Sequence, residues 1–154
     1  MLALLRHPDQ MKRLRDEPGM INVAVEELLR FDGPLDTATE RYVREDVEVA
    51  GTIIRRGELV YAVLGSANRD ERQFPDPDRL DLSREPNKHL AFGLGVHYCL
   101  GAPLARLEGQ IAIGTLVSRL PNLQIARQPL RWRRGLALRG LAALPVELPV
   151  FVGG

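Results

Sequence analysis

Phe92-Gly93-Leu94-Gly95-Val96-His97-Tyr98-Cys99-Leu100-Gly101 is the stretch on which the interpretation of this 154-residue chain depends. It contains the only cysteine of the sequence, a histidine two positions before that cysteine, and three glycines within ten residues. Glycine tolerates the positive φ angles that sharp backbone turns require, so the pattern predicts a tight loop. A helical pattern follows at 102–120, with Pro103 suited to its first turn. We therefore expect the cysteine to lie in a tight loop directly before a long helix.

The position of Cys99 favours a thiolate that binds a metal. A helix N-terminus carries roughly half a positive charge, which stabilises a nearby thiolate over the thiol. Gly101 lets backbone N–H groups approach the sulfur without a clash from Cβ. Phe92 is expected to shield the sulfur from water on one side. In extended geometry His97 points the same way as Cys99, so it can donate a hydrogen bond to an anionic group beside the metal.

Three other interpretations of Cys99 remain open on the residues alone. A lone cysteine is most often a small buried hydrophobic residue. A zinc site needs about four ligands, and His89, His97 and Cys99 are near one another in no standard spacing. A nucleophilic cysteine with His97 as its base lacks an evident third group to orient the histidine.

The bulk composition is that of an ordinary globular chain of one-domain length. Hydrophobic residues make up 45% and charged residues 27%, and the formal net charge is +1. This charge gives no electrostatic argument for binding nucleic acid or an anionic membrane. A single cysteine excludes an internal disulfide and suits a reducing cytoplasm. No apolar run approaches the ~20 residues that span a bilayer. From the charge and the absence of such a run, we expect neither a nucleic-acid partner nor a membrane partner.

The periodicity along the chain predicts the order of its elements. A helix end and a short helix are expected in 1–20, a helix at 21–31, small antiparallel strands at 39–64, an irregular segment at 65–91, the long helix at 102–120, and short strands at 122–152. Gly51 lies between two strand patterns at hairpin distance. Pro75 and Pro77 exclude a helix interior or a central strand in the irregular segment. Glu27 and Arg30 are three residues apart, which alone indicates an ordinary surface ion pair.

The spacing Phe92-x-x-Gly95-x-His97-x-Cys99-x-Gly101 resembles the haem-binding signature of the cytochrome P450 family, the haem-thiolate monooxygenases, at every defining position. Further segments resemble the soluble bacterial type of that family in order and spacing from about residue 1 to residue 150. These segments are Glu27-x-x-Arg30, Arg41, Asn68-Arg69-Asp70, Phe74-Pro75-Asp76-Pro77, Pro77-Asp78-Arg79-Leu80 and Ala102 to Glu108.

The resemblance implies a fold class and an extent. The fold is expected to be α+β, the C-terminal portion of the mainly helical cytochrome P450 fold, with small antiparallel sheets, a meander, the cysteine loop and a long following helix. Residues 1–154 form a single part of that domain. The N-terminal half and the oxygen-activating helix, with its acid–threonine pair, are expected to be absent.

The resemblance also implies the cofactor and its binding residues. Cys99 becomes the thiolate ligand of the iron in haem b, iron protoporphyrin IX. The cofactor-binding residues implied are Arg41, Phe92, Gly93, His97, Cys99, Gly101 and Ala105. Arg41 and His97 are expected to donate to the haem propionates, and Phe92 to pack beside the haem.

Two further implications concern the scaffold and the activity. Glu27, Arg30 and Arg79 are expected to form a buried ion cluster that holds the irregular segment.

The implied function is a monooxygenase that inserts one oxygen atom from O2 into a small organic substrate, with electrons from a ferredoxin or similar donor. The alternatives are a truncated, non-catalytic remnant and a haem-binding module without monooxygenase activity.

Overall fold

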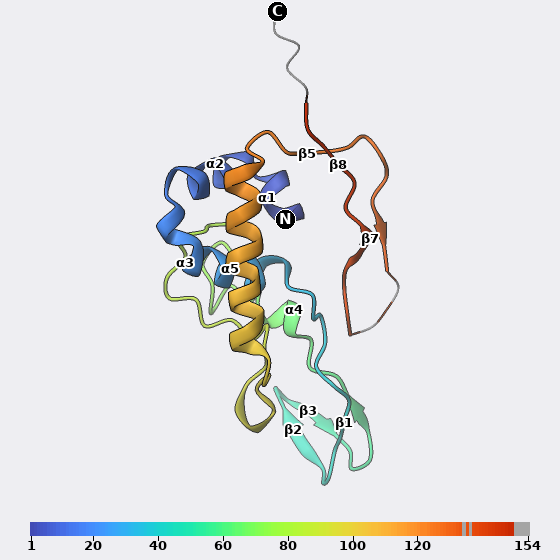
Figure 1. Cartoon of the computed structure of the whole chain (residues 1–154). Coiled ribbons are helices and arrows are strands. Elements are labelled where there is room, and N and C mark those ends of the chain that lie inside the picture. The colour runs from blue at the N-terminus through green and yellow to red at the C-terminus, as the bar shows by residue number, and fades with distance from the viewer. Residues whose placement is uncertain (134, 136, 150–154) are drawn as a thin grey trace, which may run out of the picture.

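The structure, a computed structural model, describes residues 1–133, 135 and 137–149. Its helices are α1 (Leu2–Arg6), α2 (Pro8–Asp16), the 3-10 helix η1 (Pro18–Met20), α3 (Ile21–Asp32), α4 (Leu64–Ala67), the 3-10 helix η2 (Gly95–His97) and α5 (Ala102–Arg119) (Figure 1). Its strands are β1 (Arg41–Tyr42), β2 (Val47–Val49), β3 (Thr52–Ile54), β4 (Leu59–Val60), β5 (Gln124–Ile125), β6 (Arg131–Trp132), β7 (Leu141–Ala143) and β8 (Val146–Glu147). This order confirms the α+β prediction.

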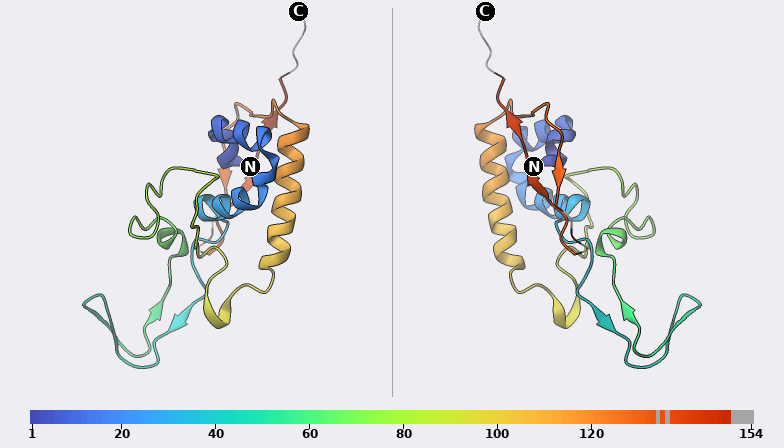
Figure 2. Two further views of the ribbon diagram at one scale, coloured as in Figure 1. Left: turned by 90° about the vertical axis from the view of Figure 1, so that its left-hand side faces the viewer. Right: turned by 90° about the vertical axis from the view of Figure 1, so that its right-hand side faces the viewer.

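The helical part is built around the side-by-side contact of α3 and α5, with α1 and α2 packed near the C-terminal end of α5 (Figures 1 and 2). The helices approach closely because α5 presents glycine to α3: a Cβ added at Gly109 would lie 3.3 Å from Cγ1 of Val25. Each fully buried leucine here contributes about 1.5–3 kcal/mol to folding. The main core consists of Ala3, Leu4, Met11, Leu14, Ala24, Leu28, Leu80, Leu82 and Val117.

The strands of the described residues form two-stranded antiparallel pairs, β1 with β4, β2 with β3, β5 with β8, and β6 with β7. The β2–β3 hairpin confirms the turn predicted at Gly51, because Val49 pairs with Thr52. Ala50 and Gly51 both have positive φ, 48° and 79°, as a two-residue hairpin turn requires. Most strand residues are exposed, and the β1–β4 and β2–β3 ribbons project from the helical part, whereas β5 contacts α1.

The irregular segment (residues 65–91) begins within the short helix α4 and wraps past α3 to the cysteine loop (Figure 2). Its backbone is mostly turns and bends, as its prolines predicted. Phe74, Leu80 and Leu82 are at most 2% exposed and fasten the segment to the helices. A long connection without regular structure is thus held in one conformation by a few apolar side chains.

The long helix was predicted at 102–120 and is observed as α5, but its predicted apolar stripe is only partly buried. Leu104, Leu107 and Ile111 are 60%, 51% and 61% exposed. The side of α5 that packs on α3 includes glycines, with a Cβ at Gly114 reaching 3.8 Å from Ile21, and Val117 of the same helix is buried in the core. Helix–helix contact therefore uses glycine, and the leucine side of α5 faces solvent. Across the part of the chain that the structure describes, no helix is both long and apolar enough to cross a bilayer.

Candidate functional site

The cysteine loop (residues 92–101) is a compact turn closed by backbone hydrogen bonds. The Cys99 N–H donates to the carbonyl of Phe92 at 2.9 Å, and the Tyr98 N–H donates to Gly95 at 3.0 Å. Gly93 and Gly95 both have φ of +73°, a value that side chains with a Cβ rarely adopt. The loop therefore reverses at its glycines and brings Cys99 back beside Phe92.

Cys99 lies at the start of α5, with its side chain open to solvent. Its carbonyl accepts the N–H of Ala102 at 3.2 Å, and Gly101 is the N-cap of the helix. A Cβ at Gly101 would lie 3.8 Å from the Cys99 sulfur, so the Gly101 backbone is next to that sulfur. The exposure overturns the interpretation of Cys99 as a buried small residue. Within the described part of the chain, no three His, Cys, Asp or Glu side chains gather where they could hold a metal.

The loop that carries the sulfur also exposes several large apolar side chains. Leu94, Val96 and Leu100 are 79%, 98% and 98% exposed, so the loop presents apolar side chains outward. Solvent exposure of several large apolar residues together is typical of a binding surface. One accessible sulfur at a helix N-terminus, with this apolar rim, has the donor and the setting that thiolate ligation of haem iron requires.

The site residues predicted from the sequence fall into two groups. Phe92, Gly93, His97, Cys99, Gly101 and Ala105 share one continuous stretch, the cysteine loop and the first turn of α5. His97 is exposed in η2, and the Ala105 N–H donates to Gly101 at 2.9 Å. Arg41 is separate, on β1, where its guanidinium donates to the carbonyls of Thr39 and Glu40 at 3.1 and 3.0 Å. The β1–β4 ribbon and the cysteine loop lie toward the same end of the molecule (Figures 1 and 2).

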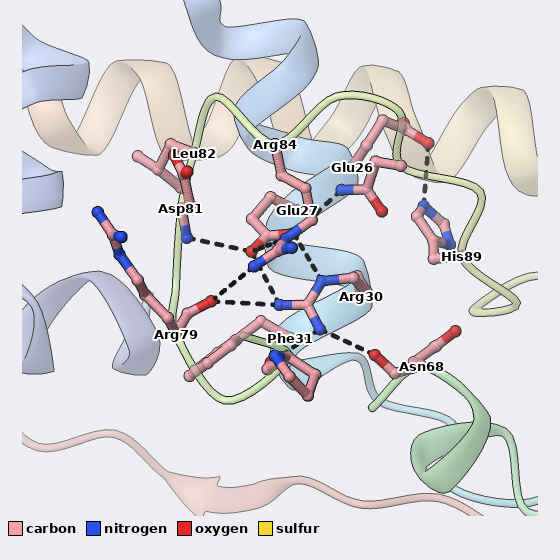
Figure 3. A network of polar contacts seen from close by, with 12 residues as sticks. Glu26, Glu27, Arg30, Phe31, Asn68, Arg79, Asp81, Leu82, Arg84 and His89 are labelled. Carbon is pink, nitrogen blue, oxygen red and sulfur yellow. Dashed lines mark hydrogen bonds and ion pairs between the residues drawn. The ribbon is translucent and has the colours of Figure 1, made fainter. Parts of the chain in front are cut away.

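A buried ion cluster fastens the irregular segment to α3 (Figure 3). The side chains of Glu27 and Arg30 are both inaccessible, and Arg30 Nε donates to Glu27 Oε2 at 2.7 Å and Nη2 to Oε1 at 2.9 Å. Arg30 also donates from Nη1 to the carbonyls of Asn68 and Pro77, at 2.8 and 2.9 Å. The interpretation of Glu27 and Arg30 as an ordinary surface ion pair is therefore wrong. The family resemblance correctly predicted that these two residues belong to a buried ion cluster.

The second arginine of this cluster is Arg84, not Arg79 as predicted. Arg84 Nε lies 3.2 Å from Glu27 Oε1, whereas the Arg79 side chain is exposed and points away from Glu27 (Figure 3). Arg79 contributes its carbonyl instead, which accepts from Arg30 and Arg84. The Asp81 N–H also donates to Glu27, at 3.1 Å. Because the backbone at 79–81 turns its polar groups inward, the Arg79 side chain is directed outward.

Arg84→Met should lower the free energy of unfolding by about 1–3 kcal/mol, because it removes charge-assisted hydrogen bonds to Glu27 and to the Pro75 carbonyl. The matched variant Arg79→Met should change it by no more than about 0.5 kcal/mol, since that side chain is exposed. Urea denaturation measures both. A larger loss for Arg79→Met would return Arg79 to the cluster.

A second polar cluster lies behind the cysteine loop, and no sequence motif indicates it as a cluster. Glu26 accepts from Arg106 and from His89, which are 80 and 63 positions away in sequence. The sequence indicates His89 only as a possible zinc ligand, and Arg106 only as part of a stretch that resembles the family and as one charge near the cysteine side of the haem. No short spacing links these residues, so only the family resemblance of 102–108, which includes Arg106, pointed toward this region.

The family model described as Cytochrome P450 matches residues 1–128. "Cytochrome P450 107B1" of Saccharopolyspora erythraea is 49% identical over 149 residues, covering 96% of this chain and 37% of that protein. The chain therefore spans little more than a third of the length of the curated relatives it matches.

Solved structures of similar proteins agree with the fold. The cytochrome P450 PksS of the bacillaene polyketide synthase from Bacillus subtilis 168 has a TM-score of 0.91 at 46% identity, over 96% of this chain and 38% of that one. P450BioI, in a crystal structure with hexadec-9Z-enoic acid ligated acyl carrier protein, has a TM-score of 0.90 at 49% identity, with the same coverage of both chains.

Proposed function

The chain belongs to the cytochrome P450 family, and from this premise we propose that it supplies the thiolate side of the haem site of a monooxygenase. The observation that carries the proposal is the exposed Cys99 sulfur, held in a glycine turn at the N-terminus of α5. Haem b, when bound there, would supply the redox chemistry by which one oxygen atom of O2 enters a small organic substrate.

The residues of the chain then have distinct roles in binding. Cys99 holds the iron, and Phe92 excludes water from one side of the sulfur. His97 and Arg41 donate hydrogen bonds to the propionates, which satisfies two carboxylates at the edge of the group. The backbone at Gly93 and Gly101, and the small side chain of Ala105, leave room for the ring to approach the loop and α5.

The partners are part of the same proposal. The substrate is a small organic molecule, and the electrons come from a ferredoxin or a similar donor protein. The single cysteine, which suits a reducing compartment, supports a location in the cytoplasm. P450BioI has been crystallised with an acyl carrier protein, so a carrier-bound substrate is one form that such a molecule can take.

A second candidate function is favoured by the openness of the site. Leu100 and Leu104 are 98% and 60% exposed beside Cys99, so the described residues leave this face accessible to water. Haem affinity and oxygen chemistry depend on exclusion of water. The chain by itself is then a haem-binding module or a remnant without monooxygenase activity, and turnover belongs to the full-length protein.

Haem titration of the purified chain tests the proposal. We expect a reduced carbon monoxide complex with the red-shifted Soret band of thiolate ligation. Chain alkylated at its single thiol before haem is added serves as the control and should lack that band. A histidine-type spectrum, or no spectrum, would reject haem-thiolate binding by this chain. Turnover with a ferredoxin and its reductase would then decide between the monooxygenase and the binding module.

A further inference from the structure

Arg106 contacts the cysteine loop at its first residue and next to Cys99. It lies on α5, and its guanidinium centre sits 4.6 Å from the ring centroid of Phe92, which opens the loop. From the same side chain, Nη1 donates to the Tyr98 hydroxyl at 2.8 Å, next to Cys99. Phe92 and Tyr98 also meet edge to face, with centroids 6.4 Å apart. One arginine therefore spans the turn that presents the sulfur.

Glu26 on α3 fixes the orientation of that arginine. Arg106 Nε donates to Glu26 Oε1 at 2.7 Å and Nη2 donates to Oε2 at 2.8 Å. A bidentate pair of this kind sets the plane of the guanidinium as well as its position. With two nitrogens held by Glu26, the third is directed to Tyr98 and the flat face lies over Phe92. Lysine has neither the plane nor the fork, so it cannot make these contacts together.

His89 completes the cluster from the end of the irregular segment (Figure 3). Its Nδ1 accepts the N–H of Ala91 at 3.1 Å, so Nε2 carries the proton and donates to Glu26 Oε2 at 3.0 Å. The side chain is 2% exposed, and burial lowers the pKa of His89 even though Glu26 opposes that shift. Ala91 directly precedes Phe92, so His89 ties the entry of the loop to the same carboxylate.

We propose that Arg106, oriented by Glu26 and His89, is a positioning residue that clamps the cysteine loop in the conformation that presents Cys99. The importance of that presentation rests on the proposed function, but the clamp itself is a property of the polypeptide without haem. Arg106 and Glu26 are 29% and 27% exposed, unlike the inaccessible Glu27 and Arg30. Loss of the clamp is therefore expected to loosen the loop more than it destabilises the fold.

The test compares Arg106→Lys with Arg139→Lys in the haem-free chain. Arg139 is a matched control because it also pairs with a carboxylate, Asp32, and lies 4.4 Å from an aromatic ring centroid, that of Trp132. We expect the Cys99 amide hydrogen to exchange about tenfold faster in Arg106→Lys, as for the loss of one charge-assisted hydrogen bond. Reaction of the single thiol with Ellman's reagent should also change in rate, while Arg139→Lys stays within about twofold of wild type.

Glu26→Gln tests the same clamp independently of whether Arg106→Lys folds well. Glu26→Gln removes the charge that orients Arg106, so it should reproduce the faster exchange. In the double variant Glu26→Gln with Arg106→Lys, this exchange should be little faster than in either single variant, because the two substitutions act through one clamp. The proposal is overturned if the Cys99 amide hydrogen exchanges at the wild-type rate in both single variants. It is also overturned if that rate follows the urea midpoint equally in all variants, including Arg139→Lys. The haem titration is a separate measurement, so failure of Cys99 as a ligand would not mimic either outcome.

Discussion

Glu27→Ala should lower the free energy of unfolding by about 3–5 kcal/mol, the penalty for breaking a buried ion pair by removing one partner. The Glu27 side chain is inaccessible, and its two oxygens lie against Arg30 and Arg84. Removal of the carboxylate leaves two guanidinium groups without their counter-ion in a dry site. Domains of this size are stable by only about 5–15 kcal/mol, so the loss is a large part of the total.

The penalty extends beyond the two arginines, because Glu27 also accepts hydrogen bonds from the irregular segment. The Asp81 N–H donates to it at 3.1 Å, and Asn87 Nδ2 donates at 3.0 Å. An unsatisfied buried donor costs about 1–3 kcal/mol by itself. We therefore expect Glu27→Ala to release the irregular segment from α3, which would appear as rapid amide exchange at 79–87 before global unfolding.

Two variants separate the effect of charge from that of shape. Glu27→Gln preserves the volume and one acceptor but leaves the arginines unneutralised, so it should cost nearly as much as Glu27→Ala. Asp16→Ala removes the exposed partner of Lys12 and should cost at most about 0.5 kcal/mol. Urea denaturation followed by circular dichroism gives all three values. Equal losses for Glu27→Ala and Asp16→Ala would show that the cluster does not hold the segment.

The local elements of this chain could be predicted because their causes are local. The helix at 21–31 follows from apolar residues such as Val25 and Leu28 on one face, and it is observed as α3. The β2–β3 turn follows from Gly51, whose φ of +79° few other residues tolerate. The cysteine loop follows in the same way from Gly93 and Gly95. Each of these features depends on residues within a few positions of one another.

The contacts between distant segments could not be predicted, because periodicity carries no information about them. Arg84 rather than Arg79 meets Glu27 because of how an irregular backbone turns, and 79–84 has no repeating pattern to indicate that turn. Likewise, the leucines of α5 gave it an apolar stripe, but Gly109 allows α3 to approach on another side. Family resemblance supplied part of this missing information, correctly for Arg30 and incorrectly for Arg79.

Cys99→Ser should abolish the red-shifted band of the reduced carbon monoxide complex while leaving the fold intact. The side chain is exposed, and the loop is closed by the backbone bond from Cys99 to Phe92, which serine retains. The free energy of unfolding should therefore change by less than about 0.5 kcal/mol. A serine hydroxyl is not deprotonated near neutral pH and does not supply the soft anionic ligand that gives the band.

His97→Ala is the matched variant, because it removes a proposed propionate donor from the same loop and leaves the sulfur in place. It should weaken haem binding by about tenfold, the value of one charge-assisted hydrogen bond, without moving the band. Titration with haem followed by the carbon monoxide spectrum measures affinity and ligand identity in one experiment. A band that survives Cys99→Ser would mean that another residue binds the iron. A band lost in His97→Ala at saturating haem would mean that His97 acts on the iron ligand, not on the propionates.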